Sequence, residues 1–168
     1  MIHIYTGNGK GKTTSAFGLA ARASGQGLKV IIFQFLKPKS LITGEEKSAR
    51  STKNIKLVKY EQAHPMFTPG AKAKVSLKKE LAEAEKAIFS GKYDMVVLDE
   101  IINAVDQGFA GKKFFLGLLK KTPKNVELIL TGRGDISELE RFADYITIMV
   151  DKKHPFRQSV NARRGIEY

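Results

Sequence analysis

The chain contains no cysteine and no tryptophan. The lack of cysteine excludes disulfide bonds, thiolate metal sites and redox chemistry based on thiols. No apolar run approaches the length of a membrane span, and no basic and apolar leader with a small-residue cleavage site opens the chain. We therefore expect a cytoplasmic protein that has no membrane partner.

Acidic residues are few, with 17 aspartates and glutamates against 29 lysines and arginines, which gives a formal net charge of +12. Such a charge could reflect a nucleic-acid partner, an anionic small substrate or a lysine-rich solvated surface. The lysines are spread along the chain without a long block, and few aromatic residues lie between them. Charge alone therefore gives only weak support to nucleic-acid binding.

The overall composition is that of an ordinary soluble protein. The 168 residues are 42% hydrophobic and 27% charged, which is typical of a globular chain with a substantial core. No repeat, low-complexity tract or linker divides the sequence. We therefore expect residues 1–168 to form a single nucleotide-binding domain.

The most informative stretch is TGNGKGKTT at residues 6–14, which lies between a short apolar run and an alanine-rich helical segment. Glycines allow consecutive backbone N–H groups to surround phosphate oxygens, and the helix N-terminus adds partial positive charge. Lys12 can reach the terminal phosphates, and the Thr13 hydroxyl can bind a Mg²⁺ ion that bridges them. The predicted nucleotide-binding residues are Gly7, Asn8, Gly9, Lys10, Gly11, Lys12, Thr13 and Thr14.

Two alternatives remain for this stretch. The strict phosphate-loop pattern G-x-x-x-x-G-K-[ST] has a glycine where this chain has Thr6. A surface turn rich in glycine and lysine is the simpler interpretation, although the strand before it and the helix after it favour a phosphate-binding loop.

Alternating patterns along the chain predict an α/β fold of the three-layer P-loop NTPase type, with a mainly parallel central sheet flanked by helices. Residues 2–6 should form a central strand and residues 55–60 a strand nearer the edge, whereas residues 38–51 and 62–75 should be loops. The other expected strands are 29–36, 93–100, 126–131 and 145–150, and the expected helices are 13–25, 76–90, 101–107, 112–121 and 135–142.

Polar residues follow the expected strands at the edge where α/β sheets bind ligands. Asp99 and Glu100 end an apolar strand, as the carboxylates that approach Mg²⁺ do in P-loop proteins. Asp99 could instead cap the next helix, and each carboxylate could have a different role. Arg133 could pair with polyphosphate through its planar guanidinium, or it could be a surface arginine. Single histidines such as His154 are more often simple polar or packing residues.

Beyond these motifs, the sequence resembles the P-loop ATP:corrinoid adenosyltransferases, also called cob(I)alamin adenosyltransferases. The resemblance covers nearly the whole chain. It lies in residues 6–23, 34–37, 44–45, 94–100, 131–133 and 143–144, and most specifically in the tail, with KHPF at 153–156 and GIEY at 165–168.

The resemblance implies transfer of the 5′-deoxyadenosyl group of ATP to the Co(I) atom of a reduced corrinoid, which would yield adenosylcobalamin or a related adenosylcorrinoid and triphosphate. It implies Mg²⁺ bound by Thr13, Asp99 and Glu100, with Lys12, Glu100 and Arg133 as catalytic residues. Arg22 joins the nucleotide-binding residues, and Phe67 and His154 become candidate corrinoid contacts. A homodimer and a separate cobalt reductase are implied as well.

Two other functions remain open from the sequence. A nucleic-acid-stimulated P-loop ATPase would account for the net charge of +12. A nucleotide-binding regulator without catalytic activity would account for the phosphate loop alone. The tail favours the adenosyltransferase.

Overall fold

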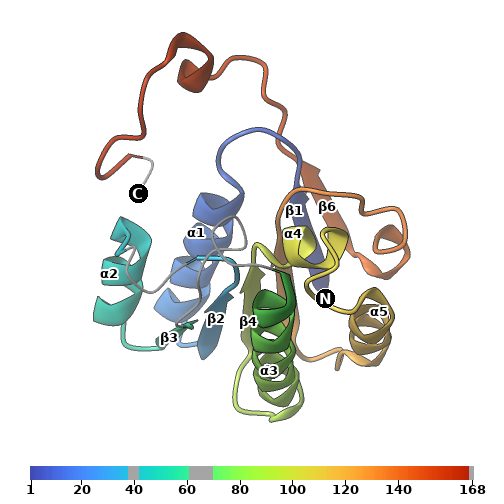
Figure 1. The fold of residues 1–168 in the computed structure, drawn as a ribbon. Helices are drawn as coiled ribbons and strands as arrows, with labels where there is room; N and C mark the ends of the chain where they lie inside the picture. Colours follow the sequence, from blue (N-terminus) through green and yellow to red (C-terminus); the bar gives the residue numbers. More distant parts are fainter. Residues whose placement is uncertain (38–41, 61–69, 167–168) are drawn as a thin grey trace.

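A computed structural model describes residues 1–37, 42–60 and 70–166, with residues 70–76 and 156 described by their backbone alone. A six-stranded sheet with the order β3-β2-β4-β5-β1-β6 lies at its centre, and every neighbouring pair of strands is parallel (Figure 1). The strands are β1 (Ile2–Thr6), β2 (Val30–Gln34), β3 (Ile55–Lys59), β4 (Met95–Asp99), β5 (Glu127–Thr131) and β6 (Tyr145–Ile148). The helices are α1 (Lys12–Gly25), α2 (Gly44–Ser51), α3 (Gly70–Phe89), α4 (Ile101–Asp106) and α5 (Lys112–Lys121).

The sheet buries both of its faces. Alternate residues of β2 face opposite sides, so that Ile32 packs toward α1, while Ile31 and Phe33 pack toward the cluster that includes α3, α4 and α5. Such burial explains why β2 and β4 are almost continuously apolar in sequence. The structure confirms the predicted three-layer α/β fold.

Helix α1 packs against the sheet through small side chains. Ala16, Ala20 and Ala23 recur at helical spacing on its buried face, where they contact residues such as Ile32 and Val97. Alanine side chains allow the helix axis to approach the strands closely. The phosphate loop before α1 is therefore fixed to the carboxyl edge of the sheet.

The expected position of one strand and the expected start of one helix were wrong. Strand β1 lies inside the sheet but next to the edge strand β6, so it is not central. Helix α3 begins at Gly70 rather than at residue 76, because the good helix formers of AKAK continue its first turns. The remaining part of the expected 62–75 loop that precedes Gly70 lies outside the described residues.

Helix α2 was expected to be part of a loop. Thr43 begins it, and the Thr43 hydroxyl accepts a hydrogen bond from the Glu46 backbone N–H at 3.4 Å. The T-x-x-E spacing of these two residues is a sequence signal for a helix start. The sequence therefore contained a signal for α2, although residues 44–51 were expected to be part of a loop.

The helix expected over residues 135–142 is instead a turn followed by a short 3₁₀ helix, Glu140–Phe142. The Asp135 carboxylate accepts hydrogen bonds from the backbone N–H and the hydroxyl of Ser137, at 2.9 and 3.0 Å. Such a local turn competes with helix formation, since it satisfies the backbone in another conformation.

The last described segment, residues 149–166, runs from β6 over the carboxyl edge of the sheet toward α2 (Figure 1). It contains a second 3₁₀ helix, Pro155–Gln158. Among the described residues, no helix combines the length and the apolar character needed to cross a bilayer.

Candidate active site

The phosphate loop has a backbone that only glycine allows. Gly11, directly before α1, has a φ angle of 114°. The Gly9 N–H donates a hydrogen bond to the Met149 carbonyl at 2.7 Å, and a Cβ atom built on Gly9 would lie 2.8 Å from that carbonyl oxygen. The glycines therefore allow the chain after β6 to pack directly on the loop.

Lys12 is folded into this loop. Its Nζ donates hydrogen bonds to the carbonyls of Gly7 and Gly9, at 2.7 and 2.8 Å, and only 6% of the residue is exposed. Burial lowers the pKa of Lys12, and the charge of Arg133 lowers it further, against the opposing charges of Glu100 and Asp99. Lys12 thus brings a partly desolvated cation to the place where the loop binds phosphate.

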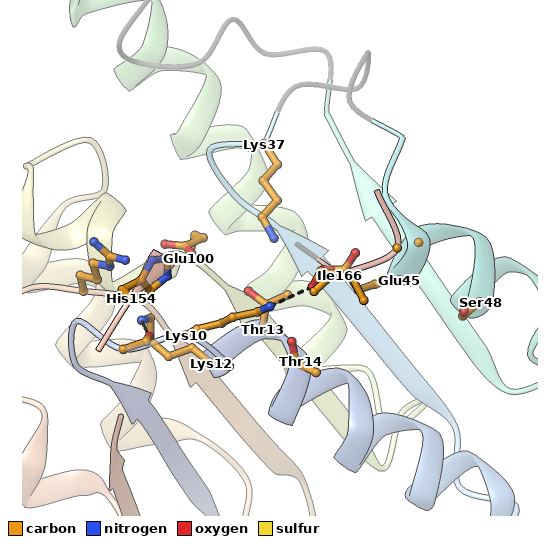
Figure 2. A pocket seen from close by; sticks show the side chains of 15 residues that line it. Lys10, Lys12, Thr13, Thr14, Lys37, Glu45, Ser48, Glu100, His154 and Ile166 are labelled. Carbon is orange, nitrogen blue, oxygen red and sulfur yellow. Dashed lines mark hydrogen bonds between the residues drawn. The ribbon is translucent and has the colours of Figure 1, made fainter. Parts of the chain in front are cut away.

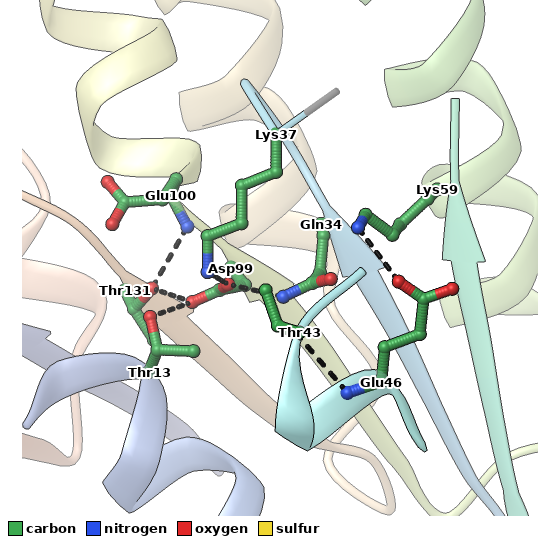
Figure 3. A network of polar contacts seen from close by, with 9 residues as sticks. All are labelled: Thr13, Gln34, Lys37, Thr43, Glu46, Lys59, Asp99, Glu100 and Thr131. Atoms are coloured by element: carbon green, nitrogen blue, oxygen red, sulfur yellow. Dashed lines mark hydrogen bonds and ion pairs between the residues drawn. The ribbon is translucent and has the colours of Figure 1, made fainter. Parts of the chain in front are cut away.

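Asp99 is the centre of a buried hydrogen-bond network (Figure 3). Its Oδ1 accepts from the hydroxyls of Thr13 and Thr131, at 2.9 and 2.7 Å. Its Oδ2 accepts from Gln34 at 3.2 Å and forms an ion pair with Lys37 Nζ at 2.9 Å. Asp99 thereby links β4 to the phosphate loop and to the ends of β2 and β5.

The network keeps Asp99 ionised although the residue is fully buried. Burial alone would raise the pKa of Asp99. The charge and hydrogen bond of Lys37, together with the hydroxyls of Thr131 and Thr13, outweigh burial and hold the pKa below its ordinary value. A carboxylate with four donors is a fixed negative charge.

Glu100 has a different position. It precedes α4 with a φ of 64°, and its backbone N–H donates to the Thr131 hydroxyl at 2.9 Å. Among the described residues its carboxylate has no hydrogen-bond partner. Burial raises the pKa of Glu100, and the charge of Asp99 adds to this effect, while Lys37, Lys12 and Arg133 oppose it. The position before α4 belongs to Glu100, so the alternative in which Asp99 caps this helix was wrong.

A cavity of about 550 Å³ lies above these groups (Figure 2). Its walls carry several cationic side chains, and both polar and apolar atoms line it. Lys10 reaches across it, and its Nζ donates to the Ile166 carbonyl at 3.1 Å. The lining residues are Gly9, Lys10, Gly11, Lys12, Thr13, Thr14, Lys37, Gly44, Glu45, Ser48, Glu100, Arg133, His154, Gly165 and Ile166.

Comparison with known proteins gives one consistent result. The family described as ATP:corrinoid adenosyltransferase BtuR/CobO/CobP matches residues 1–168. The corrinoid adenosyltransferase of Pseudomonas aeruginosa is 33% identical over 175 residues, which cover 100% of this chain and 83% of that protein. Those of Escherichia coli and Salmonella typhimurium are 30% and 31% identical over 169 residues, covering 100% of this chain and 85% of each relative.

The chain belongs to the ATP:corrinoid adenosyltransferase family. It is therefore a transferase whose substrates are ATP and a corrinoid. Family membership accounts for a cationic cavity on a P-loop fold, so the net charge of +12 does not require a nucleic-acid partner.

The cavity of this adenosyltransferase brings together most of the predicted site residues. Lys10, Lys12, Thr13 and Thr14 line it from the phosphate loop, and Glu100, Arg133 and His154 line it from three other segments. Gly7 contributes through its carbonyl bond to Lys12, whereas Asn8 is exposed outside the lining. The assignment of each residue to a catalytic or binding role stays a prediction.

Arg22 does not belong to this constellation. It lies near the C-terminal end of α1, where it lines a separate cavity with His3, Glu127 and Tyr145. Arg22 follows Lys12 by ten positions, which correspond to about three helical turns, or about 15 Å of α-helix. The structure therefore does not bring Arg22 together with the phosphate loop, and its contact with the nucleotide stays a prediction. The other corrinoid candidate, Phe67, lies outside the described residues.

Some residues of the site were missed from sequence. Lys37 and Thr131 hold Asp99, and Glu45 and Ser48 of α2 line the cavity wall opposite Lys12. The helix-start signal at Thr43 would have placed Glu45 and Ser48 on one helix beside the site. The pairing of Lys37 with Asp99 has no such local signal, since 62 residues separate the two.

The oxygen groups near the phosphate loop suit a Mg²⁺ ion. Thr13 offers a hydroxyl and Asp99 and Glu100 offer carboxylates, which are the hard ligands that Mg²⁺ prefers. No cluster of three or more histidine, cysteine or acidic side chains suited to a metal occurs in residues 1–37, 42–60 and 70–166. Mg²⁺ usually binds through one or two carboxylates and substrate phosphates, so these few ligands fit a metal that arrives with ATP.

Proposed function

We propose that the chain transfers the 5′-deoxyadenosyl group of ATP to the Co(I) atom of a reduced corrinoid. A cobalt–carbon bond forms at C5′, the C5′–oxygen bond breaks, and triphosphate leaves with the electron pair of that bond. The product is adenosylcobalamin or a related adenosylcorrinoid. The observation that carries this proposal is the cationic cavity over the phosphate loop in a chain that belongs to the adenosyltransferase family.

The protein supplies position and charge in this reaction. Because Co(I) is itself a strong nucleophile, no serine, cysteine or general base is needed to attack C5′. Lys12, Arg133 and the N–H groups of the phosphate loop stabilise the negative charge that develops on triphosphate. Lys10 adds a third cationic side chain from the exposed side of the loop.

We assign the magnesium ligands to Thr13 and Glu100. The Thr13 hydroxyl donates a hydrogen bond to Asp99, so the lone pairs of the Thr13 oxygen remain available to a cation. The Glu100 carboxylate lines the cavity, whereas both oxygens of Asp99 already accept two hydrogen bonds each. Asp99 therefore acts as the group that orients Thr13. When bound, Mg²⁺ would neutralise charge on the phosphates and hold them in place.

The corrinoid and the assembly are proposed from the family resemblance. His154 lines the cavity and is the described candidate for a corrinoid contact. A homodimer in the cytoplasm, served by a separate cobalt reductase, agrees with a chain that has no cysteine to carry electrons. Light scattering during gel filtration tests the dimer, which would elute near twice the chain mass of 18.6 kDa.

An anaerobic assay tests the reaction. The protein is mixed with Mg-ATP and chemically reduced cobalamin, and the corrin absorbance is followed. We expect the Co(I) spectrum to disappear as light-sensitive adenosylcobalamin forms. An unchanged spectrum, with ADP released only after DNA or RNA is added, would contradict the proposal and favour the ATPase alternative.

A further inference from the structure

The turn that carries Arg133 is held from outside the strand it follows. Gly132 and Gly134 flank Arg133 with φ angles of 144° and 133°, in the region that L-residues rarely adopt. A Cβ atom on Gly132 would lie 2.9 Å from the Asn103 backbone nitrogen, and one on Gly134 would lie 2.7 Å from Asp106 Cβ. The turn is therefore pressed directly onto helix α4.

Two side chains of α4 bind the backbone of this turn. The Asn103 side-chain oxygen accepts a hydrogen bond from the Arg133 N–H, and the Asp106 carboxylate accepts one from the Asp135 N–H at 3.1 Å. Asn103 and Asp106 are three residues apart, so they lie on the same face of the helix. The hydrogen bonds therefore hold the turn at two points, on Arg133 itself and two residues later.

The position of Asp106 makes this contact unusual. Asp106 is the last residue of α4, where the helix dipole favours a cation over a carboxylate, and α4 has no basic residue in its last turn. Helix propensity also gives no reason for an aspartate or an asparagine at these positions. The contact with the turn explains both residues.

Helix α4 connects two walls of the cavity. Glu100 directly precedes the helix, and Arg133 is bound to it through Asn103. Glu100 and Arg133 both line the cavity. The charge of Glu100 raises the pKa of Lys12, and the charge of Arg133 lowers it. Helix α4 thus sets the positions of Glu100 and Arg133 in the cavity together.

We propose that Asn103 and Asp106 are positioning residues that fix Arg133 for its contact with the triphosphate of ATP. Neither side chain lines the cavity, so both act through the backbone, Asn103 at Arg133 and Asp106 at Asp135. This proposal rests on the role given to Arg133 in the proposed function. The turn by itself has two glycines and would otherwise sample many conformations.

The first test measures the hydrogen bonds themselves. Amide hydrogen exchange is followed by NMR in wild type, Asn103→Ala and Asp106→Ala. We expect exchange at the Arg133 amide to rise at least about tenfold in Asn103→Ala, and the Asp135 amide to do the same in Asp106→Ala. Asp106→Asn keeps an acceptor oxygen and should preserve protection. Unchanged exchange at both amides would overturn the proposal, whatever reaction the protein catalyses.

The second test measures coupling to Arg133. The double variant Asn103→Ala/Asp106→Ala should lower kcat about tenfold with a small change in the KM for ATP, because the loss falls on charge that develops in the transition state. Arg133→Ala should lower kcat about a hundredfold. In the Arg133→Ala background, loss of the two α4 side chains should add less than about a twofold effect.

The controls separate the possible failures. Gln107→Ala changes an exposed side chain beside α4 and should leave kcat unchanged. Losses that multiply in the triple variant would show that Asn103 and Asp106 act independently of Arg133, which would overturn the proposal. A wild-type protein that forms no adenosylcorrinoid would contradict the proposed function instead, and the exchange experiment would still decide the positioning of the turn.

Discussion

The floor and the rim of the cavity are built in different ways. We define the floor as Lys12, Thr13, Asp99, Glu100 and Thr131, and the rim as Lys10, Glu45, Ser48, His154 and Ile166. Asp99 and Thr131 are fully buried. The side chains of Lys12, Thr13, Asp99 and Thr131 bind one another or loop carbonyls, and the Glu100 backbone N–H donates to Thr131. Lys10 and Ile166 of the rim are exposed, and Lys10 Nζ donates a hydrogen bond to the Ile166 carbonyl at 3.1 Å.

This difference indicates that the floor is the preorganised part of the site. Groups of the floor are fixed before any substrate arrives, so they need little reorganisation to stabilise charge on triphosphate. Apart from Lys10 of the phosphate loop, the rim comes from α2 and from the chain after β6, and its residues are more exposed than Lys12, Asp99 and Thr131. We therefore expect floor substitutions to affect kcat strongly and rim substitutions to affect mainly substrate binding.

The largest effect should come from Lys12. We expect Lys12→Ala to lower kcat about a thousandfold or more, because it removes the cation that the loop places at the phosphates. Lys12→Arg keeps the charge but does not match the two carbonyl contacts, and should recover only part of the activity. Steady-state anaerobic kinetics measure both variants. A kcat within threefold of wild type for Lys12→Ala would contradict the role of Lys12 as the cation that stabilises the phosphates.

Glu100 should show the next largest effect. Glu100→Gln removes the charge but keeps the size of the side chain, and should lower kcat about a hundredfold while weakening the response to Mg²⁺. Glu45→Gln is the matched variant on the rim and should change kcat less than about threefold. A magnesium titration of turnover checks both. Equal losses for the two glutamates would break the distinction between floor and rim.

Lys37 tests the floor through stability. Because the folded-state pKa of Asp99 is held below its ordinary value of 3.8, ionised Asp99 stabilises the fold above about pH 4, and this contribution is lost as the pH falls through the folded-state pKa. Lys37→Met leaves Asp99 buried without its cation, which should cost about 2–4 kcal/mol at pH 7.

The sign of the pH dependence distinguishes this explanation from simple packing loss. As the pH falls from about 6 to 3, the difference in free energy of unfolding between wild type and Lys37→Met should shrink, because only wild type loses the ionised pair. Urea denaturation at several pH values measures the difference, with Lys10→Met as the lysine control on the rim. A difference that stays constant with pH would contradict the role of the ion pair.

The smallest effect should come from the rim lysine. Lys10→Ala removes an exposed contact to the Ile166 carbonyl, and should raise the KM for ATP about twofold to fivefold with little change in kcat. Steady-state kinetics at low and high salt measure this effect, which should be weaker at high salt. A hundredfold loss of kcat in Lys10→Ala would contradict the assignment of Lys10 to the rim.

Local patterns in the sequence predicted most of the floor. The glycine-rich loop before an alanine-rich helix predicted Lys12 and Thr13, and an apolar strand that ends in two carboxylates predicted Asp99 and Glu100. Both are short-range patterns, and the parallel sheet brings their ends together because β5 pairs with both β1 and β4.

Contacts between distant residues were beyond prediction. The ion pair of Lys37 with Asp99 and the hydrogen bond of Asn103 to the Arg133 N–H depend on how strands and helices pack, which no local pattern encodes. The absence of the expected helix over residues 135–142 has a local cause instead, since Ser137 binds the Asp135 carboxylate in a turn that competes with the helix. Arg22, which the family resemblance adds to the nucleotide-binding residues, lines a separate cavity, and no local pattern indicates this placement.

Identification of the phosphate product tests the central claim most directly. Phosphorus NMR of an anaerobic reaction with Mg-ATP and Co(I) cobalamin distinguishes triphosphate from ADP and inorganic phosphate. We predict that wild type releases one triphosphate for each adenosylcobalamin formed, and that Lys12→Ala and Glu100→Gln release far less of both. Release of ADP, or triphosphate formed at the wild-type rate by both variants, would contradict a floor that stabilises the departing triphosphate.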